Sequence, residues 1–256
     1  MKNNYLEKYR QDNLRKAQMK MLYILKEVVA VCDRHKIPYW LDGGTLLGAA
    51  RHGGFIPWDD DVDISMRKED LERFLKIAPS ELPEDLMVQT LETDEGLHNR
   101  AYKVRDLNSF FVDGDDDNRA PYQKGMFVDI FPMDRMPLDQ DRRIQIYKEK
   151  VYSKLDAKAL SDKYSDGNDS LYGVIATSND NREFIRYKED YLKSRKLKFE
   201  GLDVNVPYDY EKCCEQQYGE NWREYVVGYS LHQTYDICCD VPYYRYFDFY
   251  PEKKTF

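Results

Sequence analysis

The sequence has no apolar run that approaches the roughly 20 residues a helix needs to cross a bilayer. The first twenty residues, MKNNYLEKYRQDNLRKAQMK, are polar and lack the apolar segment of a secretory signal peptide. These absences predict a protein without a transmembrane segment. We therefore expect a cytoplasmic location, with attachment to the surface of a membrane left open.

Cysteine is scarce and its spacing is unsuited to metal binding. The five cysteines comprise two adjacent pairs and one isolated residue, and none stands in a CxxC spacing: Cys32, Cys213, Cys214, Cys238 and Cys239. An odd set without that spacing fits neither a secreted disulfide framework nor a zinc module. We expect reduced cysteines that pack inside the protein.

The chain also lacks an excess of basic residues. Its 39 Lys and Arg are outnumbered by 47 Asp and Glu, which gives a formal net charge of -8. Binding along a nucleic acid requires clustered Lys and Arg against the phosphates, so a general nucleic-acid-binding function is excluded. A local basic pocket for a single nucleotide remains compatible with this composition.

No internal repeat or low-complexity linker divides the 256 residues, and we expect a single domain spanning 1–256. Leu14, Met21, Leu25 and Val28 recur at helical spacing, which predicts an opening amphipathic helix at about 5–36. Further helices are expected at 68–78, 139–160, 181–198 and 208–218, and strands at 39–41, 62–66, 87–90, 101–105, 110–112 and 126–131. A loop is expected at 161–168 and an irregular aromatic tail at about 225–256.

The densest chemical signal is the segment DGGTLLGAARHGGFIPWDDDVDI at residues 42–64. Asp59, Asp61 and Asp63 alternate within it, and alternate side chains of an extended chain share one face. Their carboxylates repel one another unless a cation joins them, and hard oxygen ligands suit Mg²⁺ or Mn²⁺. An acidic run is usually a solvated loop. Here apolar residues flank the acids on both sides, which places them at the edge of the core.

A calcium-binding EF-hand is excluded, because the sixth position counted from Asp59 is Ile64, where that loop needs glycine. The second acidic run, at 113–117, has Asn118 at the same position and is interpreted as a surface turn.

A pair of glycines, Gly43 and Gly44, precedes a short helix that we expect to have Thr45 as its cap and to run to Ala50. Glycines at a helix N-terminus let a phosphate approach backbone N–H groups closely, so this turn is a candidate phosphate cradle. Asp129 is a lone acid within the apolar strand GMFVDIF, where an unpaired carboxylate is costly. We expect a metal or a cationic side chain beside it.

The block YWLDGGTLLGAARHGGFIPWDDDVDI, at residues 39–64, resembles the LicD family. The later blocks TLETDEGLHNRAYKVRD, GMFVDIFPMDRMP and FEGLDVNVPYDYEKCCEQQYG resemble that family's blocks in the same order, so the likeness covers most of residues 20–220. The first block is also similar to the catalytic segment of fukutin-related protein, whose relatives transfer ribitol phosphate.

The resemblance implies an α+β fold of the nucleotidyltransferase type, with a mixed sheet flanked by helices. It also implies a set of site residues by their positions in the family's motifs: Gly43 and Gly44 as the glycine turn, Asp61 and Asp63 as paired metal ligands, Asp59 as an additional acid, and Asp129 as a third carboxylate on a neighbouring strand. The Tyr- and Cys-rich tail departs from the basic, histidine-containing segments common in the family, so acceptor recognition is not carried over.

The function that the resemblance implies is a metal-dependent transfer of a phosphorylated alcohol, phosphocholine before others, onto a glycan or lipid-linked glycan. The donor would be CDP-choline or another CDP-alcohol, CMP would leave, and Asp61, Asp63 and Asp129 would act with Mg²⁺ or Mn²⁺. Residues near the motifs are candidate donor contacts: Arg51, His52, Lys103 and Arg105 for phosphates or nucleotide, Thr45 beside the glycines, and Trp58 for a choline headgroup.

Two other functions remain open on the residues. The same acids would serve a nucleotidyltransferase that places a nucleotide from an NTP on a small acceptor. From a different class, the fold would suit a non-catalytic glycan-binding subunit whose aromatic tail stacks on sugars. The complete set of acids argues against the non-catalytic alternative. Each of the basic residues proposed as a donor contact can instead form a surface ion pair.

Overall fold

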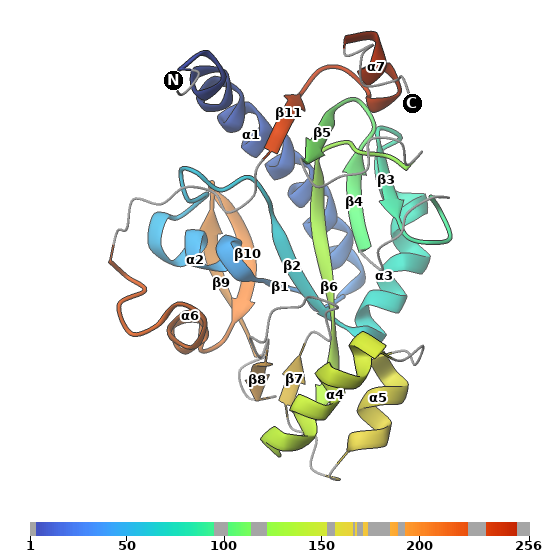
Figure 1. Cartoon of the computed structure of the whole chain (residues 1–256), viewed down its shortest axis with the longest axis vertical. Coiled ribbons are helices and arrows are strands. Elements are labelled where there is room, and N and C mark those ends of the chain that lie inside the picture. Colours follow the sequence, from blue (N-terminus) through green and yellow to red (C-terminus); the bar gives the residue numbers. More distant parts are fainter. Residues whose placement is uncertain are drawn as a thin grey trace.

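The computed structural model describes residues 4–94, 102–113, 122–152, 157–165, 167, 171–173, 185–188, 193–224 and 234–249, and these form a mixed α+β fold (Figure 1). The helices are α1 (Asn4–His35), α2 (Gly43–His52), α3 (Lys68–Glu81), α4 (Gln140–Tyr152), α5 (Ala157–Tyr164), α6 (Tyr210–Tyr218), η2 (Tyr243–Arg245) and α7 (Tyr246–Phe249). The strands are β1 (Trp40–Leu41), β2 (Asp63–Arg67), β3 (Leu86–Gln89), β4 (Tyr102–Asp106), β5 (Phe110–Asp113), β6 (Phe127–Met136), β7 (Leu171–Gly173), β8 (Ile185–Lys188), β9 (Ser194–Phe199), β10 (Leu202–Pro207) and β11 (Thr234–Cys238).

The central sheet has the order β1-β2-β6-β4-β3, and the long strand β6 lies in its middle. Strands β2 and β6 run parallel, whereas β1 with β2, β6 with β4 and β4 with β3 run antiparallel. Beyond this sheet, the far end of β6 pairs with β7, which in turn pairs with β8. The mixed sheet flanked by helices that was expected from the sequence is therefore confirmed.

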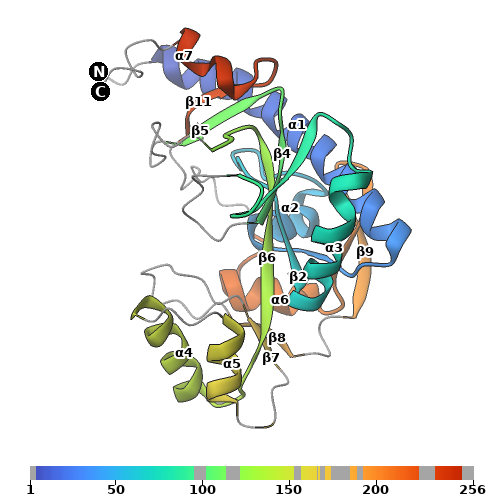
Figure 2. The ribbon, with the colours of Figure 1, turned by 90° about the vertical axis from the view of Figure 1, so that its right-hand side faces the viewer.

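Helices α1 and α3 lie next to each other on the same side of the central sheet (Figure 2). Helix α1 presents a buried stripe that includes Met21, Ile24, Leu25 and Val28, all with 0% exposure, and it contacts β4 and β6. Burial of each such side chain stabilises the fold by roughly 1.5–3 kcal/mol. The opening helix expected at about 5–36 is thus present, and its apolar spacing reflects this contact with the sheet.

The strands β9 and β10 form a separate antiparallel hairpin that lies beside α2 and β1. Its two-residue turn, Glu200 and Gly201, has positive φ at both positions, 50° and 80°. Such a turn follows the twist of the two strands. A helix was expected over 181–198, and this prediction is wrong: β8 and β9 occupy its described parts. The Glu-Gly turn was not recognised because it lacks the Asn-Gly or Asp-Gly signal typical of hairpins.

Three smaller expectations also need correction. The loop expected at 161–168 is helical as far as Tyr164, because Leu160 packs with Met136 and Ile146 in a small apolar cluster. The helix expected over 139–160 is described as two helices, α4 and α5, with 153–156 outside the described residues. The tail from 225 contains β11, which pairs with β5, as well as η2 and α7; residues 225–233 and 250–256 lie outside the described part.

Among the residues that the structure describes, none of the helices combines the length and the apolar character that a bilayer-spanning segment requires.

Candidate active site

The turn between β1 and α2 is fixed by Asp42, which the sequence reasoning did not select. Its carboxylate caps α2 by accepting a hydrogen bond from Gly43 N at 2.7 Å, and it also accepts one from the hydroxyl of Ser65. Its backbone N–H donates to Asp63 O at 3.0 Å. An acid directly before a glycine pair and an apolar helix is a typical N-cap signal. Asp42 therefore joins the start of α2 to β2.

Thr45 does not cap α2, in contrast to the expectation. It lies inside the helix with 1% exposure, and its hydroxyl accepts a hydrogen bond from Asp63 N at 2.9 Å. The cap is one turn earlier because the glycines themselves belong to the helix. Thr45 thus helps to hold the first residue of β2, and a contact with the donor stays a prediction.

The two glycines leave room for two of the acids. A Cβ built on Gly43, whose φ is 52°, would lie 2.9 Å from Oδ2 of Asp63. A Cβ on Gly44 would lie 3.0 Å from Oδ2 of Asp59. Both separations are shorter than normal carbon–oxygen contacts, so a larger residue would displace the acids. The structure thereby brings the glycine turn and the acidic segment together, as the sequence predicted.

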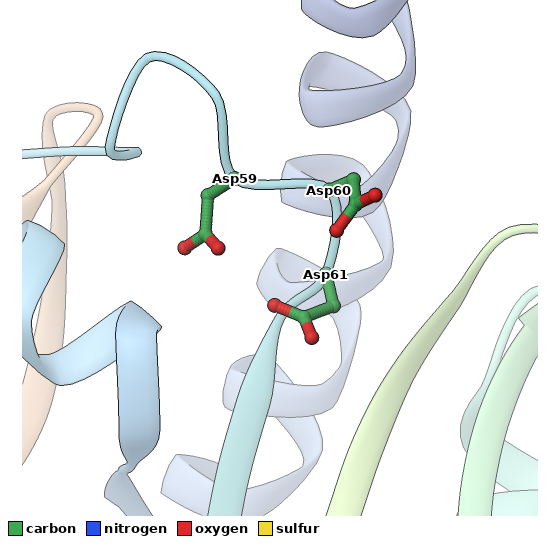
Figure 3. Close-up of side chains that lie close together, drawn as sticks. All are labelled: Asp59, Asp60 and Asp61. Carbon is green, nitrogen blue, oxygen red and sulfur yellow. The ribbon is translucent and has the colours of Figure 1, made fainter. Parts of the chain in front are cut away.

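Three consecutive acids lie on the loop that leads into β2 (Figure 3). Asp59, Asp60 and Asp61 each offer a carboxylate oxygen, and these oxygens lie within 4.8 Å of one another. Asp60, which is only 4% exposed, was passed over because strict alternation was assumed. Strand β2 begins only at Asp63, so the alternation of a strand does not apply to 59–61.

The parallel strands β2 and β6 place two further acids side by side, since Asp63 and Asp129 are register partners. The pKa of Asp63 lies well above its ordinary value, chiefly because its surroundings desolvate the charge. Repulsion from the carboxylates of Asp61, Asp129, Asp42 and Asp59 raises it further. Strands and loop therefore concentrate negative charge at the beginning of β2.

The cationic partner expected for Asp129 is Lys103 on the neighbouring strand β4. The two residues are register partners in the antiparallel ladder and their side chains form an ion pair. The Lys103 ammonium also lies 3.8 Å from the centre of the Phe127 ring. Both charged side chains are less than 20% exposed, at 16% for Lys103 and 18% for Asp129. Lys103 therefore lies at the acidic cluster. This is the position that a contact with a donor phosphate would require.

Two of the arginines proposed as donor contacts have structural partners. Arg105 is 4% exposed and donates to the Gln89 side chain and to Gly125 O, both at 2.5 Å. Arg51 donates to Trp222 O and to Glu224 O at 3.1 and 3.0 Å. Arg105 thus braces the sheet and Arg51 ties the end of α2 to the segment after α6, while a contact of either arginine with the donor stays a prediction.

Of the other two proposed contacts, His52 is the last residue of α2 and Trp58 lies in the loop that follows it. Burial and the neighbouring charge of Arg51 lower the pKa of His52, which favours the neutral imidazole. Trp58 is partly buried and packs against the main core while it directly precedes Asp59. Nothing in these contacts assigns a ligand to either residue, and both roles stay predictions.

A family comparison matches residues 36–162 of the chain, about half of its length, to "LicD/FKTN/FKRP, nucleotidyltransferase domain". "Lipopolysaccharide cholinephosphotransferase LicD" of Haemophilus influenzae is 38% identical over 125 residues, which cover 48% of this chain and 45% of that protein. An uncharacterized protein of Rickettsia typhi is 29% identical over 217 residues, which cover 85% of this chain and 51% of that protein.

A shorter and more similar match joins this chain to "Ribitol 5-phosphate transferase FKRP" of Homo sapiens, with 57% identity over 44 residues, or 17% of this chain and 9% of that protein. The chain spans about half the length of the two longer-matching relatives. Together with the glycine turn and the gathered acids, these matches identify residues 36–162 as a domain of the LicD family.

Proposed function

We propose that this protein transfers a phosphorylated alcohol from a CDP-linked donor to a glycan, with phosphocholine as the first candidate. The observation that carries the proposal is the convergence of the Asp59–Asp61 oxygens, Asp63 and Asp129 beside the glycine turn. The named activities of two relatives, a cholinephosphotransferase and a ribitol 5-phosphate transferase, support a phosphorylated alcohol as the group transferred.

The acidic cluster fits a hard divalent cation. Its donors are carboxylate oxygens, the atoms that Mg²⁺ and Mn²⁺ prefer. Burial and the neighbouring carboxylates raise the pKa of Asp63, and a bound cation would relieve that repulsion. Asp61 and Asp63 would hold the ion, with Asp59, Asp60 and Asp129 as further ligands. When bound, such an ion would neutralise charge on the diphosphate of the donor.

The chain's own residues would position the reactants. The α2 N-terminus offers backbone N–H groups to a phosphate at the glycine turn, and Lys103 offers an ammonium beside Asp129. An acceptor hydroxyl would attack the phosphorus that carries the alcohol, the phosphoanhydride bond would break, and CMP would leave with that bond's electrons. The hydroxyl proton would pass to a base, and we propose Asp129, whose carboxylate pairs with Lys103, for that role.

The products distinguish this reaction from its alternative. We would incubate the protein and Mg²⁺ with labelled CDP-choline, CDP-ribitol or CDP-glycerol and a polysaccharide extract, and measure CMP and glycan-bound label. We expect CMP and glycan-bound label in equal amounts. The rate of CMP release should fall by at least about 100-fold in the Asp61→Asn variant. The exposed Glu211→Gln on α6 is the matched control.

The nucleotidyltransferase description of the family domain favours one second candidate, the transfer of a nucleotide from an NTP. Pyrophosphate release together with a nucleotide-labelled acceptor would overturn the proposed reaction. If neither CMP nor pyrophosphate forms with any donor while the glycan still binds, the protein is a binding subunit and the proposal fails.

A further inference from the structure

The loop at residues 53–62 carries Asp59, Asp60 and Asp61 but belongs to no helix or strand. Its internal support includes the bond from Asp59 N to Ile56 O at 2.9 Å. Backbone groups outside regular structure need partners elsewhere, so the elements packed around the loop determine where its acids point. Two residues far away in the sequence supply such partners.

The first is Gln18 on α1, a polar side chain that is only 2% exposed. Its amide nitrogen donates to Asp59 O at 2.9 Å and to Ile56 O at 3.3 Å. An amide NH₂ group carries two hydrogens, so one side chain satisfies both ends of the turn. Arg15 donates to the amide oxygen of Gln18 at 3.1 Å and thereby fixes which way the amide faces.

The second is Glu200 in the turn of the β9–β10 hairpin. Its backbone N–H donates to Gly53 O at 2.8 Å, and its carboxylate accepts from Phe55 N at 3.2 Å. A Cβ on Gly54 would lie 2.4 Å from that carboxylate, so the loop and Glu200 are in close contact. Arg15 donates two bonds to the same carboxylate, at 2.9 and 2.7 Å.

From these contacts we propose that Gln18 and Glu200 are positioning residues, which hold the 53–62 loop so that its acids meet the glycine turn. The proposal rests on the proposed function for its consequence, the binding of a divalent cation. Both residues lie outside the family domain at 36–162. The segments before and after that domain would thus complete its site.

The first test uses the metal-free protein and hydrogen exchange of the loop amides. Gln18→Met keeps the length of the side chain but cannot donate, and Glu200→Met cannot accept from Phe55 N. Glu200→Gln keeps an acceptor and should restore near-normal exchange. We expect at least about 10-fold faster exchange at Phe55 or Asp59 in the Met variants. Val31→Ala, which opens a small cavity under α1 away from the loop, is the control for general destabilisation and should leave both amides unchanged.

The second test measures binding of Mn²⁺ alone by its electron paramagnetic resonance signal. Removal of groups that support ligands typically weakens metal binding by about 10–100-fold, and we expect about 10-fold for Gln18→Met and Glu200→Met. Glu200→Gln and Val31→Ala should stay within about twofold of the parent protein. Hydrogen exchange unchanged in both Met variants would overturn the proposal, as would normal Mn²⁺ affinity in both. Mn²⁺ binding that survives Asp61→Asn would instead refute the proposed metal site, and exchange alone then decides the role of Gln18 and Glu200.

Discussion

Asp63 is a carboxylate whose charge the site disfavours, through burial first and through repulsion by the neighbouring acids second. Because its folded-state pKa is raised, the native state favours the protonated form. Its contribution to stability is therefore fully present below the unfolded pKa of about 3.9 and is lost as the pH rises through the folded pKa. At neutral pH and without a metal, Asp63 should weaken the fold.

The corresponding prediction concerns Asp63→Asn in the metal-free protein. At neutral pH the variant should be more stable than the parent by about 0.5–2 kcal/mol, the size of effect seen when strained functional residues are replaced. The difference should shrink as the pH falls below the raised folded-state pKa of Asp63, and it should be smallest below about pH 4, where the carboxylate is protonated in both the folded and the unfolded state. Thermal unfolding at several pH values measures it. A variant that is less stable at every pH would show that the crowding of acids is not destabilising.

A second residue-scale prediction concerns the pair of Asp129 and Lys103. Asp129→Ala leaves a largely buried ammonium without its carboxylate, so it should both abolish turnover and destabilise the fold. Adding Lys103→Met removes the orphaned charge and should recover much of the stability while activity stays absent. Urea unfolding and CMP release measure the two effects. Turnover at the wild-type rate in Asp129→Ala would show that Asp129 does not belong to the active site.

At this scale the sequence predicted most of the gathered residues, because alternation, a glycine pair and a lone acid in an apolar strand are local patterns. It did not predict the partners that come from elsewhere. Gln18 and Glu200 lie far from the acidic loop in sequence, and no local pattern marks either as its support. The bond from Arg105 to Gln89 was not predicted for the same reason, since Gln89 lies on the adjacent strand.

At the scale of elements, α2 and the acidic loop are packed closely through glycine. A Cβ on Gly48 would lie 2.5 Å from the carbonyl oxygen of Gly54 and 3.2 Å from Ile56 N. Backbone atoms cannot move aside as a flexible side chain can. The absence of a side chain at Gly48 therefore sets the distance between the helix and the loop.

We predict that Gly48→Ala destabilises the protein by about 1–3 kcal/mol through overpacking, although alanine favours an isolated helix by about 1 kcal/mol. It should also reduce turnover, because the displaced loop carries the acids. Gly219→Ala after α6 is the control: its φ is 86° with no atom within 4 Å, so it adds only local strain. Chemical denaturation and CMP release provide the measurements. A stabilised, active Gly48→Ala would contradict this packing.

Elements were predictable where periodicity reports burial, as in α1, α3 and the strands of the central sheet. The β9–β10 hairpin was missed because β9, SRKLKF, exposes most of its side chains and so lacks a clear alternation of apolar residues. Pairing with β10, whose Val204 and Val206 are fully buried, determines its conformation. Strand β10 comes after β9 in the sequence and acts through tertiary packing, so the pattern within β9 alone does not reveal the pairing.

At the scale of the whole molecule, the family domain does not contain all of its own core. Four fully buried α1 residues, Met21, Ile24, Leu25 and Val28, precede residue 36 and contribute to the same apolar cluster as the sheet. At roughly 1.5–3 kcal/mol each, their loss is comparable with the 5–15 kcal/mol that stabilises a typical domain.

A fragment limited to residues 36–162 should therefore lack a cooperative unfolding transition. Circular dichroism during heating and the dispersion of amide proton resonances would measure this, with the full chain as the reference. Sharp, cooperative melting of the fragment would show that the α1 stripe and the hairpin are dispensable for the fold.

The parallel pairing of β2 with β6 also has a kinetic consequence. Asp63 and Asp129 are neighbours in space but about a quarter of the chain apart in sequence. Contacts of such long range form late and slowly during folding, because the intervening chain must first be ordered. A ligand that needs acids from both strands finds no binding site in the unfolded or partly folded chain. Such a ligand should slow unfolding and leave the rate of folding unchanged.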